Sequence, residues 1–181
     1  GFAAGLGDSE THFLTELNYV VFAKLVRDPA GFDVQAFCRA YLVNRFGDFA
    51  ADDLLASLNI QSDIWNLFFC SIERGGYGFL NLAPYSNWAR FGDLYTSFPH
   101  ANTKALDWIM KQSTEELKTS LNLLTPLLQE QEKAMALVLD VKAQIRQTGQ
   151  FMYTDYQLQT KGYLHYLESR EALLKAMIAE R

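Results

Sequence analysis

Cysteine, positive charge and long apolar runs are all scarce in this sequence, and each scarcity excludes a class of protein. The two cysteines, Cys38 and Cys70, are too few for a disulfide-rich scaffold or a cysteine-based zinc site. Their apolar neighbours favour buried free thiols, although one disulfide stays open in an oxidising compartment. Lysine and arginine total 16 against 21 acidic residues, and a net charge of −5 disfavours nucleic acid as a partner. No apolar run of about 18 residues occurs, so we expect no membrane span.

The motifs of common catalytic and cofactor sites are missing as well. The glycine-rich stretches lack the third glycine of a dinucleotide site, and no phosphate loop occurs. A di-iron centre in a helical bundle needs Glu-x-x-His on two helices, and the nucleophile elbow of a hydrolase needs Gly-x-Ser-x-Gly. Neither motif occurs in the sequence. His12 and His100 are isolated, and His165 with Glu168 makes a single pair. The sequence therefore predicts no catalytic constellation, no metal and no cofactor.

Helical periodicity is what the sequence has in abundance. Hydrophobic residues make up 49% of the chain, and they recur mostly at spacings of three and four. Strand patterns are nearly absent, so we expect an all-α helical bundle. The 181 residues read as a single helical domain, with N-terminal helices over 10–73, an irregular aromatic-rich segment over 74–100 and a long antiparallel helical hairpin over 101–181.

The sharpest pattern lies in residues 10–47, which read as two antiparallel helices. Pro29 ends the first helix, because the residue before a proline is pushed out of the helical region. Asp33 can cap the second helix with its carboxylate, and Gly47 ends it at a position that favours the left-handed conformation. Asp48 then begins a short helix with Phe49 in its apolar set.

Further boundaries are expected along the chain. The polar run 59–62 predicts a break before another helix, and Ser113 with Glu116 forms a capping box. The helix that follows either kinks or restarts at Pro126 and is expected to end near Thr148 and Gly149. A last helix is predicted from about residue 151 to 178.

The aromatic segment 74–100 is the best candidate for a ligand-binding surface. Flat rings such as Tyr77, Tyr85 and Trp88 can stack on sugars or apolar groups. The same rings can pack the segment onto the helices, and this second interpretation is the one we favour.

Paired carboxylates are the other chemistry that the sequence offers. Glycoside hydrolysis needs two carboxyl groups at a defined separation, and Asp8, Glu10, Glu16, Asp52 and Asp53 are the candidates. Carboxylates near helix starts more often cap the helix or favour its dipole, so we expect a structural role for each.

Residues 16–29, which read ELNYVVFAKLVRDP, together with 34–42 and Phe46-Gly47, resemble the helical region that follows the catalytic barrel in bacterial glycoside hydrolases. The resemblance is to enzymes of the α-glucuronidase-like and hexosaminidase-like kind and related uncharacterised proteins. It covers about 40 residues well, and residues 100–180 only as a similar helical hairpin. Arg27 departs from the family pattern, which often has Trp before Asp-Pro. No catalytic residue carries over, because in that family the catalytic residues lie on the barrel.

The resemblance implies a non-catalytic helical domain, the C-terminal part of a larger carbohydrate-active enzyme, that supports the catalytic domain or its substrate cleft. Its expected partners are the catalytic domain of the same polypeptide or carbohydrate, in a periplasmic or secreted setting. The alternative is an autonomous helical interaction or oligomerisation domain, cytoplasmic by default, whose hairpin of residues 113–178 binds a partner or a second copy.

Overall fold

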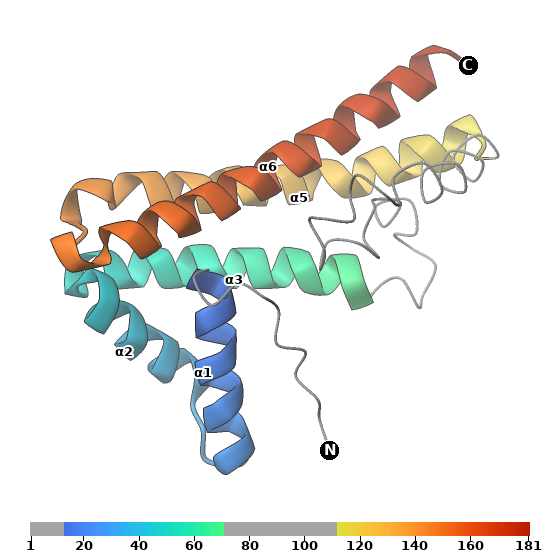
Figure 1. The fold of residues 1–181 in the computed structure, drawn as a ribbon. Helices are drawn as coiled ribbons and strands as arrows, with labels where there is room; N and C mark the ends of the chain where they lie inside the picture. Colours follow the sequence, from blue (N-terminus) through green and yellow to red (C-terminus); the bar gives the residue numbers. More distant parts are fainter. Residues whose placement is uncertain (1–12, 71–111) are drawn as a thin grey trace, which may run out of the picture. The chain divides into compact units, whose positions relative to one another are not determined.

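The computed structural model describes residues 13–70 and 112–181, and this part of the chain is all-α (Figure 1). It contains no strand, in agreement with the expected fold class. The described residues form five α-helices and two short 3₁₀ turns: α1 (Phe13–Arg27), α2 (Val34–Phe46), α3 (Asp48–Cys70), α5 (Thr114–Asp140), η4 (Lys142–Gln144), η5 (Gln147–Gly149) and α6 (Gln150–Ala179).

The chain divides into two compact units. The first draws its described residues from Gly1–Ile60 and Glu132–Tyr163, and the second from Gln61–Gln131 and Leu164–Arg181. Helices α3, α5 and α6 each contribute one segment to each unit. The prediction of a single domain over residues 1–181 stays a prediction, and the aromatic segment 74–100 lies outside the described residues.

Helices α1 and α2 form the hairpin that the sequence predicts. Within the turn, the carboxylate of Asp28 accepts a hydrogen bond from the N–H of Gly31 (2.9 Å). Asp33 caps α2, because its carboxylate accepts from the N–H of Ala36 (3.0 Å). Gly47 ends α2 with φ 109° and ψ 158°, a positive-φ but extended conformation in place of the left-handed helical one expected.

The predicted break after the first turns of α3 is wrong. α3 runs unbroken from Asp48 to Cys70, and the polar run 59–62 lies inside it. No glycine or proline stands in this helix to interrupt it, and Gln61 is buried with 4% exposure. Phe49 was also misassigned to the apolar face, since its side chain is 87% exposed.

The capping box at the start of α5 is confirmed. The N–H of Ser113 donates to Glu116 Oε2 (2.6 Å), and the N–H of Glu116 donates to Ser113 Oγ (3.3 Å). The Ser113 hydroxyl also donates to Glu116 Oε2 (2.8 Å), and the two bonds from Ser113 to this carboxylate lower the pKa of Glu116, the backbone bond contributing most. Pro126 lies inside α5, so the restart considered at this proline does not occur.

α5 ends earlier than its apolar spacing predicts. The helix stops at Asp140, and the chain turns through η4 and η5 before α6 begins at Gln150. Ile145 therefore belongs to the turn, where its backbone carbonyl accepts from Gln150 Nε2 (3.0 Å). The periodicity continued past the end of the helix because the turn residues Val141 and Ile145 are also buried. The last helix is as predicted, and α5 and α6 form the long antiparallel hairpin (Figure 1).

A buried aromatic and polar cluster holds the helices of the first unit together. Tyr153 and Tyr156 of α6 are almost fully buried, and each hydroxyl has a partner. Tyr153 donates to the carbonyl of Val138 (2.7 Å), and the Tyr156 hydroxyl lies 2.9 Å from Ser57 Oγ. Ser57 also donates to the carbonyl of Ala134 (3.0 Å), so one hydroxyl links α3, α5 and α6. Satisfied buried hydroxyls of this kind fix how helices pack.

Cys38 is a free, half-buried thiol packed against this core. Burial raises its pKa, which disfavours the thiolate that would react. The prediction of a buried free thiol is confirmed in part for Cys38, which is half-buried. For Cys70 it stays a prediction, because its side chain is not among those described.

Two glycines give a matched test of the packing. A Cβ on Gly149 would lie 2.4 Å from the carbonyl oxygen of Arg45, whereas a Cβ on Gly162 in α6 meets nothing within 4 Å. We expect Gly149→Ala to lower the free energy of unfolding by about 1–3 kcal/mol, because backbone atoms must move. Gly162→Ala should raise it by about 0.5–1 kcal/mol, because glycine is costly inside a helix. Urea unfolding followed by circular dichroism measures both, and equal effects of the two changes would contradict the packing described.

Candidate interaction surface

The N-terminus of α1 is fastened to α6 by one carboxylate. The backbone N–H of Phe13, the first residue of α1, donates to Asp155 Oδ2 (2.7 Å). The same oxygen accepts from Gln159 Nε2 (2.8 Å), which holds the carboxylate in place. The first N–H groups of a helix have no partner within the helix, and its N-terminus favours negative charge, so Asp155 satisfies both needs.

The ring of Phe13 adds an apolar anchor at the same point. Its side chain is fully buried, and its centroid lies 5.0 Å from that of Tyr156 and 5.3 Å from that of Phe46. Tyr41 of α2 lies farther off, at 6.4 Å. The first turn of α1 is therefore bound to α2 and α6 by both a charge-assisted hydrogen bond and aromatic packing.

Glu16 joins α1 to α2. Its Oε1 accepts hydrogen bonds from the hydroxyl of Tyr41 and from the guanidinium of Arg45. The same guanidinium lies over the ring of Tyr41, 5.4 Å from its centroid. Burial and then the hydrogen bond to Glu16 raise the pKa of Tyr41 to about 12. A carboxylate engaged by two donors in this way acts as a clamp between helices.

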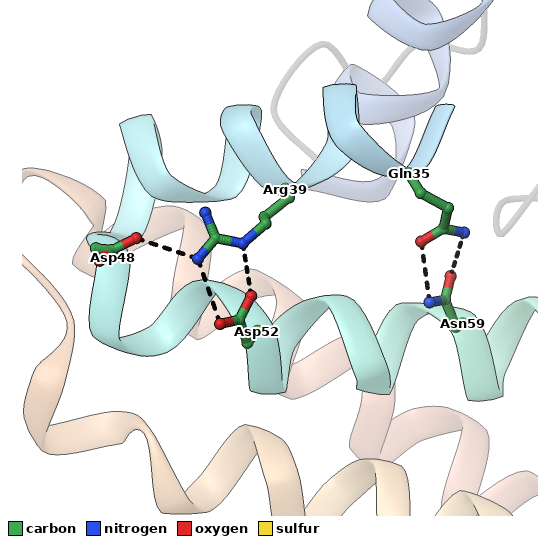
Figure 2. Close-up of polar contacts among 5 residues, drawn as sticks. All are labelled: Gln35, Arg39, Asp48, Asp52 and Asn59. Atoms are coloured by element: carbon green, nitrogen blue, oxygen red, sulfur yellow. Dashed lines mark hydrogen bonds and ion pairs between the residues drawn. The ribbon is translucent and has the colours of Figure 1, made fainter. Parts of the chain in front are cut away.

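Asp52 joins α2 to α3 in a similar manner (Figure 2). Arg39 of α2 reaches both oxygens of Asp52, with Nε 2.7 Å from Oδ1 and Nη2 3.3 Å from Oδ2, and also contacts Asp48 at 3.3 Å. Hydrogen bonding to Arg39 lowers the pKa of Asp52, so this carboxyl is poorly suited to donate a proton near neutral pH. Glu16 and Asp52 thus each form an ion pair with an arginine of α2.

A reciprocal amide pair completes the row between α2 and α3. Gln35 Nε2 donates to Asn59 Oδ1 (3.0 Å), and Asn59 Nδ2 donates to Gln35 Oε1 (3.2 Å), as Figure 2 shows. Asn59 was read from the sequence as part of a helix break. Its side chain instead binds α2, because a residue inside α3 can present its amide to the neighbouring helix.

The second half of α1 exposes apolar side chains. Phe22 is 37% exposed, Leu25 39% and Val26 61%, whereas Phe13 and Leu17 on the other side of the same helix are buried. The apolar spacing that begins at Phe13 does not account for Phe22 and Val26 on this second side of the helix. The available signal was the position of Phe22 and Val26, four residues apart and off the stripe that begins at Phe13.

Other predicted site residues lie outside the described residues. These include the ligand-binding candidates Tyr77, Tyr85 and Trp88, and the carboxylates Asp8 and Glu10.

No site for a metal ion is found among the described residues. No group of three or more His, Cys, Asp or Glu side chains there could hold one. The predicted pair of His165 and Glu168 exists, with 2.7 Å between Nδ1 and Oε2, and both side chains are solvent-exposed. No helix in residues 13–70 and 112–181 has the length and apolarity to cross a membrane.

Comparison of the chain with family models, with curated proteins and with solved structures gives no match.

The clamp around Glu16 has a pH signature. Tyrosine ordinarily ionises with a pKa of 10.0, and folding raises that of Tyr41 to about 12. As the pH rises the unfolded chain loses this proton first, so the contribution of Tyr41 to stability is complete below pH 10.0 and is lost as the pH approaches about 12. We expect Tyr41→Phe to flatten the decline of stability over this window, measured by urea unfolding at several alkaline pH values.

Glu16→Gln should lower the pKa of Tyr41 toward its ordinary value in a tyrosinate absorbance titration. An unchanged titration in Glu16→Gln would contradict the clamp.

Proposed function

We propose that this chain is a non-catalytic helical domain of a larger carbohydrate-active enzyme of the glycoside hydrolase kind. It supports the catalytic domain or its substrate cleft and performs no chemistry of its own. The expected partner is the catalytic domain of the same polypeptide, and the expected setting is periplasmic or secreted.

The observation that carries this proposal is the engagement of the candidate carboxylates. Glu16 is bound by Tyr41 and Arg45, and Asp52 is bound by Arg39. A glycosidase needs one carboxyl that keeps a proton near neutral pH and a second placed across the scissile bond. Asp52 has a lowered pKa and an arginine on both oxygens, so it fits a structural role better than an acid's role.

The resemblance of residues 16–47 supplies the rest of the support. Its helix, Asp-Pro turn and second helix correspond to α1, the turn at Asp28 and α2. Glu16, which joins the two helices of this hairpin, and Arg39, which binds the hairpin to α3, lie within the resembling stretch. The stretch therefore encodes a scaffold, which agrees with a domain that lies beside an active site.

An autonomous interaction domain remains the second candidate, and the exposed apolar face of α1 is the observation that favours it. Binding of a partner or a second copy through the long hairpin of residues 113–178 has less support. Leu124 and Leu128 of α5 have 0% and 8% exposure, so they are already used within the chain. Leu128→Asp would then destabilise the fold instead of dissociating an oligomer.

The proposal is tested by the open reading frame and by activity. We expect the source gene to encode several hundred further residues that include a catalytic barrel, and we expect the isolated 181-residue chain to hydrolyse no aryl glycoside. The full-length protein should hydrolyse one, which is the positive control. A start codon just before Phe2, or hydrolysis by the isolated chain, would overturn the proposal.

A further inference from the structure

The α1–α2 hairpin has a buried base and an exposed outer part. The base consists of four side chains that are 0–5% exposed, Phe13, Leu17, Leu42 and Phe46. Residues 18–40, which we call the outer hairpin, contain no buried side chain. Segments with few buried apolar contacts open at the lowest free-energy cost in a protein. The outer hairpin therefore depends more than the base does on polar contacts at its edge.

Two polar contacts join the outer hairpin to α3, and we call them the latch (Figure 2). Arg39 pairs with Asp52 and Asp48, and Gln35 exchanges two hydrogen bonds with Asn59. Both contacts lie in solvent, and the Arg39 and Asp52 side chains are 44% and 71% exposed. An exposed ion pair shifts an equilibrium by only about 1.5- to fivefold. The latch thus positions α2 against α3 and still breaks easily.

The turn of the outer hairpin has contacts of its own. The carboxylate of Asp28 accepts from the N–H of Gly31 (2.9 Å), and the rings of Phe32 and Phe37 lie 5.2 Å apart. None of these contacts involves α3, so they do not have to break when the latch does. Because this turn ties the end of α1 to the start of α2, a displacement of one helix is passed on to the other.

The latch covers an apolar position on α3. Leu55 lies three residues after Asp52 and four before Asn59, so the three residues share one side of the helix. The Leu55 side chain is half-buried and packs against the core. Loss of both latch contacts would uncover this side chain.

We propose that the outer hairpin is a strap, which detaches from α3 and unfolds as one unit while the base stays folded. Once detached, the outer turns 18–27 of α1 and 34–40 of α2 are too short to stay helical by themselves, since isolated helices below about 12 residues are marginal in water. Opening uncovers the Leu55 side of α3, so the strap controls access to it. The strap does not depend on the proposed function, and its failure would leave that proposal untouched.

Hydrogen exchange of the 181-residue chain tests the strap. After correction for intrinsic rates, we expect the amides of residues 22–27 and 38–40 to exchange at least about tenfold faster than those of residues 54–57 in α3. The reason is that the strap opens without disrupting the core, whereas the α3 amides exchange only when the core itself opens.

Arg39→Gln should speed exchange of both strap segments by the same factor, about two- to fivefold. The bonds of Arg39 go to α3, so a response of the α1 amides 22–27 reports opening of the strap as a unit. Raising NaCl from about 0.1 M to about 1 M should accelerate the parent similarly, because the screening length falls from about 10 Å to about 3 Å. The salt response should vanish in Arg39→Gln. Asn59→Ala loosens the latch at its other contact and should also accelerate both segments.

Lys118→Gln is the matched control. It removes an equally charged side chain of similar exposure, 51%, whose ion pair with Glu115 lies within α5. The strap amides should exchange at the parent rate in this variant.

The uncovering of α3 is tested by thiol labelling. Leu55→Cys, in a chain that also carries Cys38→Ser and Cys70→Ser, should react with iodoacetamide about two- to fivefold faster when Arg39→Gln is added. Loss of a nearby cation disfavours the thiolate, so it would slow the reaction if the strap did not open.

Several results would overturn the strap. Equal exchange in residues 22–27, 38–40 and 54–57 would do so. Acceleration of residues 38–40 alone in Arg39→Gln would mean that α2 frays by itself. An equal response to Lys118→Gln would assign the effect to net charge, and unchanged labelling of Leu55→Cys would show that opening leaves this side of α3 covered.

Discussion

The position of α1 depends on one residue, Phe13, which is held through its backbone and its side chain at once. Its N–H is bound by Asp155 of α6, and its ring lies in the aromatic cluster with Phe46 and Tyr156. The contacts with Asp155 and Tyr156 join residues more than 140 positions apart in sequence, and they bring the start of α1 onto α6. The carboxylate satisfies the open end of α1, and the ring contributes apolar burial in the same place. The rest of α1 is oriented from this point and from the contacts of Glu16 with α2.

The polar contacts of α2 follow the same logic of joining helices. Arg39 and Gln35 bind α3 (Figure 2). Tyr41 and Arg45 bind α1, so α2 is held on two sides. Exposed ion pairs such as Arg39 with Asp52 contribute little stability each, and their value lies in fixing which helix faces meet. Carboxylates committed to this task are poor candidates for catalysis, which supports the proposal that the chain performs no chemistry of its own.

The sequence was informative where the signal is local. Asp33, Gly47 and the Ser113–Glu116 box marked helix ends correctly, because capping depends on residues within one turn. The helix boundaries predicted from the sequence were wrong where contacts between helices determine the structure. The run 59–62 resembled a break, but Asn59 and Gln61 are held by packing inside α3, and α5 ended before its apolar periodicity did. The candidate site shows the same division. The partners of Glu16 on α2 are 25 and 29 residues away in sequence, the partner of Asp52 is 13 residues away, and no spacing rule identifies them.

The most direct test of the account is the turnover of the full-length protein, which we propose to be a glycoside hydrolase, after Glu16→Gln and after Asp52→Asn, each measured where circular dichroism shows the variant to be folded. If these carboxylates are clamps between helices, kcat stays within about threefold of the parent for both variants, because no proton transfer is lost. A loss of about a hundredfold or more in kcat by either folded variant would identify that carboxyl as an acid or base in the reaction and would contradict the account.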